Sequence, residues 1–219
     1  RHLEGDLALA MLQETRATVR EDLLLCVMSA TLDPAPLQDF LDGAEVVEAD
    51  GRLHPVEVEH LARITNADLE VLVRDGVERA LDETDGDVLV FLPGVGEIGR
   101  CQAALQNLAR RRAVAVLPLH GRLDLKEQSR AIRPADGRKV VLSTNVAESS
   151  LTIAGVSAVV DSGLARELRF DRGRGVDVLE LGRISLASAT QRSGRAGRTG
   201  PGRCYRLWSQ AEERRMLPH

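Results

Sequence analysis

Aromatic side chains are scarce in this sequence, which has three phenylalanines, one tyrosine and one tryptophan among 219 residues. A protein that holds single-stranded nucleic acid mainly by base stacking needs aromatic platforms, so stacking is not expected to be the main mode of binding. Lysine is also nearly absent, with two residues against 27 arginines. A biased genome explains the choice of arginine over lysine, but it does not explain where the arginines gather.

Cysteine is too sparse and too scattered to organise the chain. Cys26, Cys101 and Cys204 are odd in number and form no CxxC pair, and the five histidines add no metal-ligand spacing. Neither a disulfide framework nor a metal site is therefore predicted. The sequence also lacks the apolar run of ~20 residues that a membrane span needs, and it lacks a signal peptide. These absences favour a cytoplasmic protein with no membrane partner.

The net charge of −4 hides a marked asymmetry along the chain. Residues 41–88 carry 14 acidic and 4 basic side chains, whereas residues 163–206 carry 10 arginines and 4 acids. A basic segment of this kind is expected to face polyphosphate or nucleic acid.

Apolar runs alternate with amphipathic stretches, which predicts an α/β fold with a parallel sheet covered by helices on both faces. A boundary is placed near residue 53, and an antiparallel hairpin is predicted at about 164–184 around a Gly-Arg turn. Helices are expected at 6–19, 66–83, 96–111 and 124–132, and strands at 23–28, 87–92, 113–119, 139–144, 158–163 and 202–208.

The segment "QRSGRAGRTGPG" (191–202) concentrates arginine and glycine. On an α-helix, Gln191, Arg195 and Arg198 would share one face, while Gly194 and Gly197 would let another backbone or a ligand approach. Two guanidinium groups beside an amide suit a triphosphate, because arginine stabilises charge on the γ-phosphoryl group and glutamine orients a water. The alternative is a solvated basic helix, on which four glycines in twelve residues are hard to justify.

Two further segments place hydroxyl groups after predicted strands. In "STNVAESSLTIAG" (143–155), Thr144 and Asn145 are suited to hydrogen-bond phosphate oxygens without reading bases, although an ordinary helix cap is an alternative. The "SAT" segment (29–31) is weak by itself, and capping of a helix that starts at Pro34 is its simpler explanation.

Together these segments resemble the superfamily 2 helicases, and specifically the DEAH-box RNA helicases. "QRSGRAGRTGPG" is similar to their motif VI, "STNVAESSLTI" to motif V, "SAT" to motif III and "VFLPG" to motif IV. The stretch at 161–198 is similar to the HrpB-like bacterial branch, and "RHLEGDLALA" resembles the sequence that follows the DEAH box there. The resemblance covers essentially the whole chain.

The resemblance implies a P-loop NTPase architecture of two RecA-like lobes that enclose ATP, with RNA bound across both. Residues 1–53 would be the C-terminal remnant of the first lobe, and residues 54–219 the second lobe. The P-loop and the DEAH box that holds Mg²⁺ are absent from the sequence, so ATP with Mg²⁺ would be held mainly by first-lobe motifs. The chain alone is therefore predicted to be inactive.

The resemblance also assigns roles by motif. Gln191 would position the water, and Arg195 and Arg198 would be arginine fingers. Three residues would lie near the nucleotide: Ser150, Gly194 and Ile132. Ile132 occupies the position where relatives have an aromatic residue that packs against adenine. Lobe closure would be coupled to the ATP state by Ser29, Ala30 and Thr31. The RNA backbone would be contacted by Thr144, Asn145, Gly94 and Gly121, and the hairpin would lie near the point where strands part.

The leading hypothesis is thus the C-terminal half of an ATP-dependent, 3′-to-5′ RNA helicase motor that acts on single-stranded RNA or on a duplex with an overhang. Two alternatives are kept. One is a non-catalytic nucleic-acid-binding or regulatory module without the P-loop lobe, and the other is a DNA-acting superfamily 2 enzyme. The sequence does not predict the oligomeric state.

Overall fold

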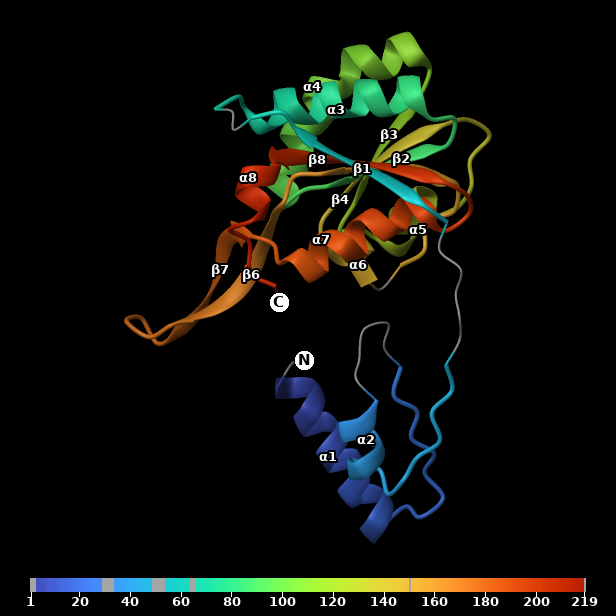
Figure 1. The fold of residues 1–219 in the computed structure, drawn as a ribbon, viewed down its shortest axis with the longest axis vertical. Coiled ribbons are helices and arrows are strands. Elements are labelled where there is room, and N and C mark those ends of the chain that lie inside the picture. The colour runs from blue at the N-terminus through green and yellow to red at the C-terminus, as the bar shows by residue number, and fades with distance from the viewer. Residues whose placement is uncertain (1–2, 29–33, 49–53, 64–65, 150, 219) are drawn as a thin grey trace. The chain divides into compact units, whose positions relative to one another are not determined.

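The computed structural model describes residues 3–28, 34–48, 54–63, 66–149 and 151–218. The chain divides into two compact units, residues 1–51 and residues 52–219 (Figure 1). The first unit contains helix α1 (Leu3–Thr18) and the short helix α2 (Ala35–Phe40). Helix α2 ends where Asp42 and Gly43 adopt positive φ angles of 57° and 79°, the left-handed conformation that commonly terminates helices.

The predicted strand at 23–28 is wrong. This segment has no regular secondary structure, and Leu24 and Met28 expose 94% and 87% of their surface. A buried parallel strand exists only when neighbouring strands complete its hydrogen bonds. In the described part of the first unit there are helices but no strand, so the apolar run has no sheet to join.

The second unit is built on a six-stranded parallel sheet with the order β1-β8-β5-β2-β4-β3. The strands are β1 (Val56–Leu61), β2 (Asp87–Phe91), β3 (Ala115–Leu119), β4 (Lys139–Ser143), β5 (Val156–Asp161) and β8 (Gly202–Ser209). Helices cover both faces of the sheet (Figure 1). The predicted α/β fold is therefore confirmed.

Alternate residues of each inner strand supply the two layers of the core. Val88 and Val90 point toward helices α3 (Leu69–Glu83) and α4 (Val95–Arg112). Leu89 and Phe91 point to the opposite layer. That layer consists of α5 (Leu125–Ile132), α6 (Val146–Ser149), α7 (Leu186–Ser193) and the 3₁₀ helix η1 (Gly194–Gly197). Burial on both faces explains why these strands read as continuous apolar runs.

An antiparallel hairpin leaves the sheet after β5. Its strands are β6 (Leu164–Asp171) and β7 (Val176–Arg183), joined by a turn at 172–175. The base of the hairpin packs on α7, on Trp208 of β8 and on Met216, which follows the short helix α8 (Gln210–Glu213). In the described part of the chain, no helix combines the length and hydrophobicity needed to cross a membrane.

Candidate functional site

The carboxyl edge of the parallel sheet gathers several of the predicted site residues. Gly94 follows β2, Gly121 follows β3, and Thr144 and Asn145 follow β4, and these three strands are neighbours in the sheet. The Thr144 side chain is half-buried, and its N–H donates to the Leu119 carbonyl at 3.3 Å. Asn145 and Gly121 are exposed. The carboxyl edge is where parallel α/β sheets bind ligands.

Gly94 lies under two charged side chains. It is the N-cap of α4, and a Cβ built there would lie 2.9 Å from both Arg166 Nε and Glu97 Oε2. Arg166, on β6, donates to Glu97 Oε1 at 3.0 Å. Burial by itself would raise the pKa of Glu97, but its own backbone N–H and the Arg166 guanidinium outweigh burial and lower it. A carboxylate therefore already faces the N-terminus of α4.

The glycine-rich segment is not one continuous α-helix, and this part of the sequence prediction is wrong. Helix α7 ends at Ser193, and residues 194–197 continue as a 3₁₀ helix. In a 3₁₀ helix, side chains three residues apart lie one above the other. Arg195 and Arg198 therefore still point to the same side, but Gln191 is on the preceding α-helix.

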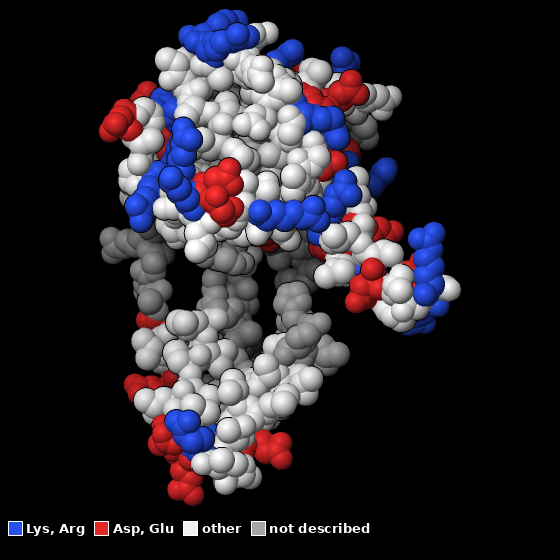
Figure 2. Space-filling model, turned by 180° about the vertical axis from the view of Figure 1, so that it is seen from behind, with Lys and Arg blue, Asp and Glu red and all other residues white. Residues whose placement is uncertain are grey.

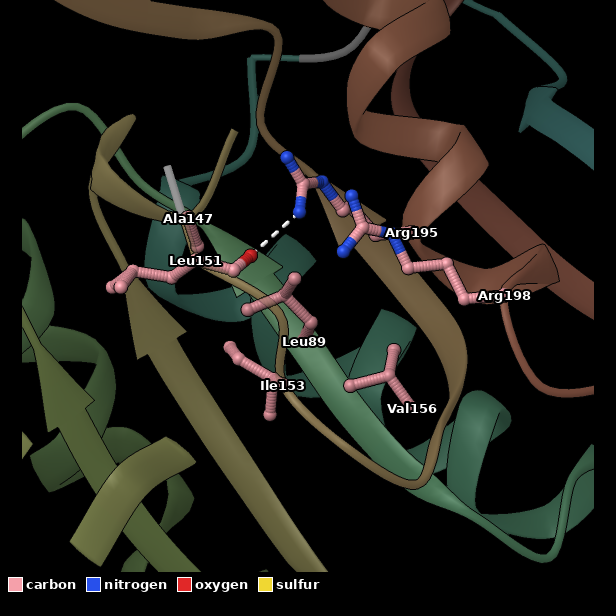
Figure 3. Close-up of a pocket in the computed structure, with 7 residues that line it drawn as sticks. All are labelled: Leu89, Ala147, Leu151, Ile153, Val156, Arg195 and Arg198. Atoms are coloured by element: carbon pink, nitrogen blue, oxygen red, sulfur yellow. Dashed lines mark hydrogen bonds between the residues drawn. The ribbon is translucent and has the colours of Figure 1, made fainter. Parts of the chain in front are cut away.

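Arg195 and Arg198 line a small pocket whose floor is apolar (Figure 3). Arg195 is 7% exposed and donates to the carbonyls of Leu151, at 2.6 Å, and Glu148. Arg198 is exposed and donates to the Thr152 hydroxyl. Burial, followed by the positive charge of Arg198, lowers the pKa of Arg195 to about 10.

Neither arginine of this pocket forms an ion pair with a carboxylate among the residues that the structure describes. Other arginines of the basic segment are paired: Arg203 contacts Glu57, Glu59 and Glu83, which belong to the acidic segment. Basic and acidic side chains are accordingly mixed over the face seen in Figure 2. Most arginines of the basic segment therefore have carboxylate partners, whereas Arg195 and Arg198 have none among the described residues.

The other predicted residues of the glycine-rich segment have less distinctive positions. Gln191 is half-buried and is not among the residues that line the pocket. Gly194 has an ordinary helical φ of −58°. Gly197 does permit a close approach, but by the chain itself: a Cβ there would lie 2.5 Å from the His54 carbonyl. The His54 N–H also donates to the Gly197 carbonyl at 2.8 Å.

Ile132 ends α5 and packs, half-buried, against the core on that side of the sheet. Four predicted site residues, Ser29, Ala30, Thr31 and Ser150, lie outside the described residues. Within the described ranges, no group of three or more His, Cys, Asp or Glu side chains is arranged to hold a metal ion.

Sequence reasoning missed a buried ion cluster centred on Arg192. Its Nε donates to Glu148 Oε2 at 2.8 Å, and its Nη1 donates to Asp161 Oδ1 at 3.0 Å and to the Leu164 carbonyl at 3.3 Å. The guanidinium lies 4.8 Å from the centre of the Phe91 ring. The one available signal was the acidic residue at the end of the apolar run 156–161, because a buried carboxylate needs a cation.

Comparison with known proteins identifies the family. The helicase conserved C-terminal domain matches residues 65–200. The chain belongs to this helicase family. The family domain therefore covers most of the parallel sheet, the carboxyl edge and the glycine-rich segment.

Individual helicases align over nearly the whole chain. ATP-dependent RNA helicase HrpB of Escherichia coli is 45% identical over 219 residues, which cover 98% of this chain and 27% of that protein. HrpA of the same organism is 39% identical over 96% of this chain and 16% of its own length. A crystal structure of E. coli HrpB, 43% identical, superposes with a TM-score of 0.87 over 99% of this chain and 28% of that one. The chain thus spans about a quarter of the HrpB length, and the resemblance to the DEAH-box RNA helicases is confirmed.

Proposed function

We propose that these residues form the C-terminal half of an ATP-dependent, 3′-to-5′ RNA helicase motor, with Arg195 and Arg198 as the groups that neutralise the transferring phosphoryl group. One observation carries the proposal: Arg195 and Arg198 lie side by side, and among the described residues no carboxylate forms an ion pair with either of them. The two guanidinium groups repel each other when the site is empty, and an anion that binds between them is attracted by both. Both relatives are named ATP-dependent RNA helicases, and for this reason we take ATP as the nucleotide and RNA as the nucleic acid.

The donor set fits the phosphate part of ATP. Arg198 is exposed, and within the described ranges its one hydrogen bond is to the Thr152 hydroxyl, so its guanidinium is available to a phosphate oxygen. Arg195 is engaged by main-chain carbonyls and needs a side-chain rotation to reach the same anion. Gln191, on the preceding helix, would orient the attacking water. Ser150, Gly194 and Ile132 would lie near the rest of the nucleotide.

Mg²⁺ does not fit the described residues, because no suitable cluster of acidic or imidazole ligands is found among them. We therefore place no step of the reaction on a metal ligand of this chain. In the complete motor, the ion and most of the triphosphate would be held by the P-loop and DEAH box of a first lobe.

Residues 1–53 fit the role of the C-terminal part of such a first lobe. Their apolar segment 23–28 is exposed and lacks sheet partners among the described residues, and strands of a preceding lobe would supply them. Ser29, Ala30 and Thr31 would then follow a buried strand and couple ATP binding to closure of the two lobes.

RNA would bind across the carboxyl edge of the second lobe. Thr144 and Asn145 would contact phosphate oxygens by side chain, and Gly121 by main chain. Gly94 is buried beneath Arg166 and Glu97, and its main chain would reach a phosphate only after these side chains move. Such contacts are independent of sequence. Cycles of lobe closure on ATP and reopening after hydrolysis would then advance the strand, which can be single-stranded RNA or the overhang of a duplex.

The deciding experiment is ATP hydrolysis by the complete protein with the substitution Arg198→Ala. We expect RNA-stimulated turnover to fall about 10³-fold or more, as for other arginine fingers, with ATP affinity changed little. Arg198 is preferred to Arg195 because it is exposed and supports no main-chain group. Arg111→Ala is the matched control, since Arg111 is exposed and forms an ion pair with Glu78 on the other face of the sheet. Turnover at the wild-type level in Arg198→Ala contradicts the assignment.

A further inference from the structure

A groove lies between α4 and the edge strand β3, on the face of the sheet that α3 and α4 cover (Figure 1). Three small residues of α4, Gly99, Ala103 and Ala109, line it together with Val116 of β3, and their lack of bulk keeps it open. Its volume of about 380 Å³ is within the range of ligand-binding sites. The lining residues are distinct from the proposed ATP and RNA contacts, so the groove needs an explanation of its own.

Strand β3 presents main-chain groups along its open edge. The N–H of Ala115 and the carbonyl of Leu119 bond to the residues that flank the two ends of β4. Because alternate residues of a strand direct their N–H and carbonyl to opposite sides, Val116 and Pro118 direct theirs away from β4. Pro118 has no N–H to leave unpaired there, as is typical of an edge strand. The open edge therefore offers one donor and two acceptors to an additional strand.

The opposite wall of the groove carries side chains that suit a peptide main chain. Gln102, Gln106 and Arg110 line the groove at four-residue intervals along α4, which places successive side chains ~6 Å apart along the helix axis. Alternate residues of an extended chain are ~6.6 Å apart, and a glutamine amide combines a donor and an acceptor as a peptide group does. Gln102 Nε2 already donates to the Val116 carbonyl, at the long distance of 3.5 Å, so an incoming strand replaces a weak contact.

Charge indicates which kind of chain the groove accepts. Helix α4 ends with three consecutive arginines, of which Arg111 and Arg112 form ion pairs with carboxylates of α3. Arg110 instead lines the groove and donates to Asn107 Oδ1 at 2.6 Å, and within the described ranges it forms no ion pair with a carboxylate. The groove thus has one cation that lacks an anion. Nucleic acid is a less suitable occupant, because backbone binding requires several free cations.

We propose that the groove between α4 and β3 binds an extended, acidic segment of a partner protein, which pairs with the edge of β3 and places a carboxylate against Arg110. Main-chain hydrogen bonds to Val116 and Pro118 set the register of the segment, and Gln102 and Gln106 hold its alternate peptide groups. Addition of a strand to a sheet edge is a common mode of peptide recognition. The inference does not depend on the proposed function, and it adds an interaction surface to it.

The experiment begins with a selection, because the partner is identified here only by its chemistry. Random twelve-residue peptides displayed on phage are selected against the complete protein while saturating single-stranded poly(U) occupies its nucleic-acid sites. We expect the enriched peptides to share Asp or Glu and β-branched residues, which favour an extended chain. The most enriched peptide is then labelled with fluorescein, and its affinity is measured by fluorescence polarisation with and without poly(U).

Two matched variants test the predicted contact. Arg110→Glu should weaken binding of the labelled peptide at least about tenfold, because a carboxylate then faces a carboxylate. Arg111→Glu makes the same charge change one residue away, on the side of α4 that pairs with α3, and should change the affinity less than about twofold. Ala103→Trp fills the groove and should also prevent binding. A peptide whose acidic residues are replaced by lysine should bind Arg110→Glu more tightly than wild type, which a folding defect cannot produce.

Several outcomes overturn the proposal. They are a selection that enriches no peptide, enriched peptides without acidic residues, and equal affinity for wild type and Arg110→Glu. Displacement of the peptide by poly(U) would mean that nucleic acid occupies the groove instead of a protein segment. Each of these results leaves the proposed function intact, because that is tested separately by ATP hydrolysis in Arg198→Ala.

Discussion

Arg192 Nη1 lies 3.0 Å from Asp161 Oδ1, and both side chains are almost completely withdrawn from solvent at the carboxyl edge of the sheet. Burial raises the pKa of Asp161 above its usual value. Burial also opposes the charge of Arg192, but Asp161 and Glu148 outweigh that effect and raise the pKa of Arg192. The pair links α7 to β5, and through Glu148 it also links α7 to α6.

Replacing Arg192 by methionine should therefore be costly. We expect Arg192→Met to lower the free energy of unfolding by about 3–5 kcal/mol, because the buried carboxylate of Asp161 and the half-buried one of Glu148 lose their cation. Urea unfolding of the 219-residue chain measures the change. The control Arg111→Met breaks one exposed contact and should cost no more than about 1 kcal/mol. A loss below 1 kcal/mol in Arg192→Met would show that the cluster contributes little to stability.

The turn from β5 into the hairpin depends on Gly163. This residue has a φ of 70°, and a Cβ there would lie 2.7 Å from the Trp208 ring. Gly163→Ala should destabilise the second unit by about 2–4 kcal/mol, because backbone strain and overpacking act together. Gly182→Ala in β7, where a Cβ would meet no atom within 4 Å, should change stability by less than about 0.5 kcal/mol. Thermal unfolding of the two variants provides the comparison.

The carboxylate of Glu97 should make stability depend on acid pH. Its folded pKa is lowered, so the unfolded chain binds a proton at a higher pH than the folded protein does. The stabilisation is therefore fully present above the unfolded pKa of ~4.3 and is lost as the pH falls through the lower folded value. The partners Arg166 and Arg100 stay charged throughout.

Glu97→Gln should accordingly lower the free energy of unfolding by about 1–2 kcal/mol near pH 7, and the difference from wild type should shrink below about pH 4. Urea unfolding at a series of pH values measures this difference. The same replacement at the exposed Glu127 should change stability by less than about 0.5 kcal/mol at pH 7. A Glu97 difference that is as large at pH 3 as at pH 7 would be inconsistent with a charge-dependent contact.

The proposed phosphate contact of Thr144 predicts an effect that is uniform across RNA sequences. In the complete protein, Thr144→Ala should weaken binding about three- to tenfold, as expected for one hydrogen bond to a charged group. The loss should be similar for U-rich, A-rich and mixed oligonucleotides, because phosphate contacts do not read bases. Thr84→Ala, at the end of α3, is the control. A loss confined to one sequence would mean that Thr144 contacts bases.

Much of the fold could be predicted from the sequence because local pattern and burial agree there. The runs at 88–91 and 140–142 are apolar and buried throughout, and they lie in the interior strands β2 and β4. The run at 23–28 has the same pattern but is not a strand in this chain, because a strand also requires partners that its own residues do not encode. The α-helix predicted through Arg198 changes to a 3₁₀ helix after Ser193, and at Gly197 this segment packs against the main chain of His54, a residue far away in sequence.

For the candidate site, the sequence by itself determined which chemistry is present: arginines among glycines, and hydroxyl and amide groups after buried strands. Only the tertiary structure decided which arginine does what. Arg192, Arg195 and Arg198 stand three residues apart and look alike in the sequence, yet the first is neutralised by Asp161 and Glu148, the second is held by main-chain carbonyls and the third is exposed. Electrostatic energy depends on distance and burial, and folding sets both by bringing together residues more than 30 positions apart.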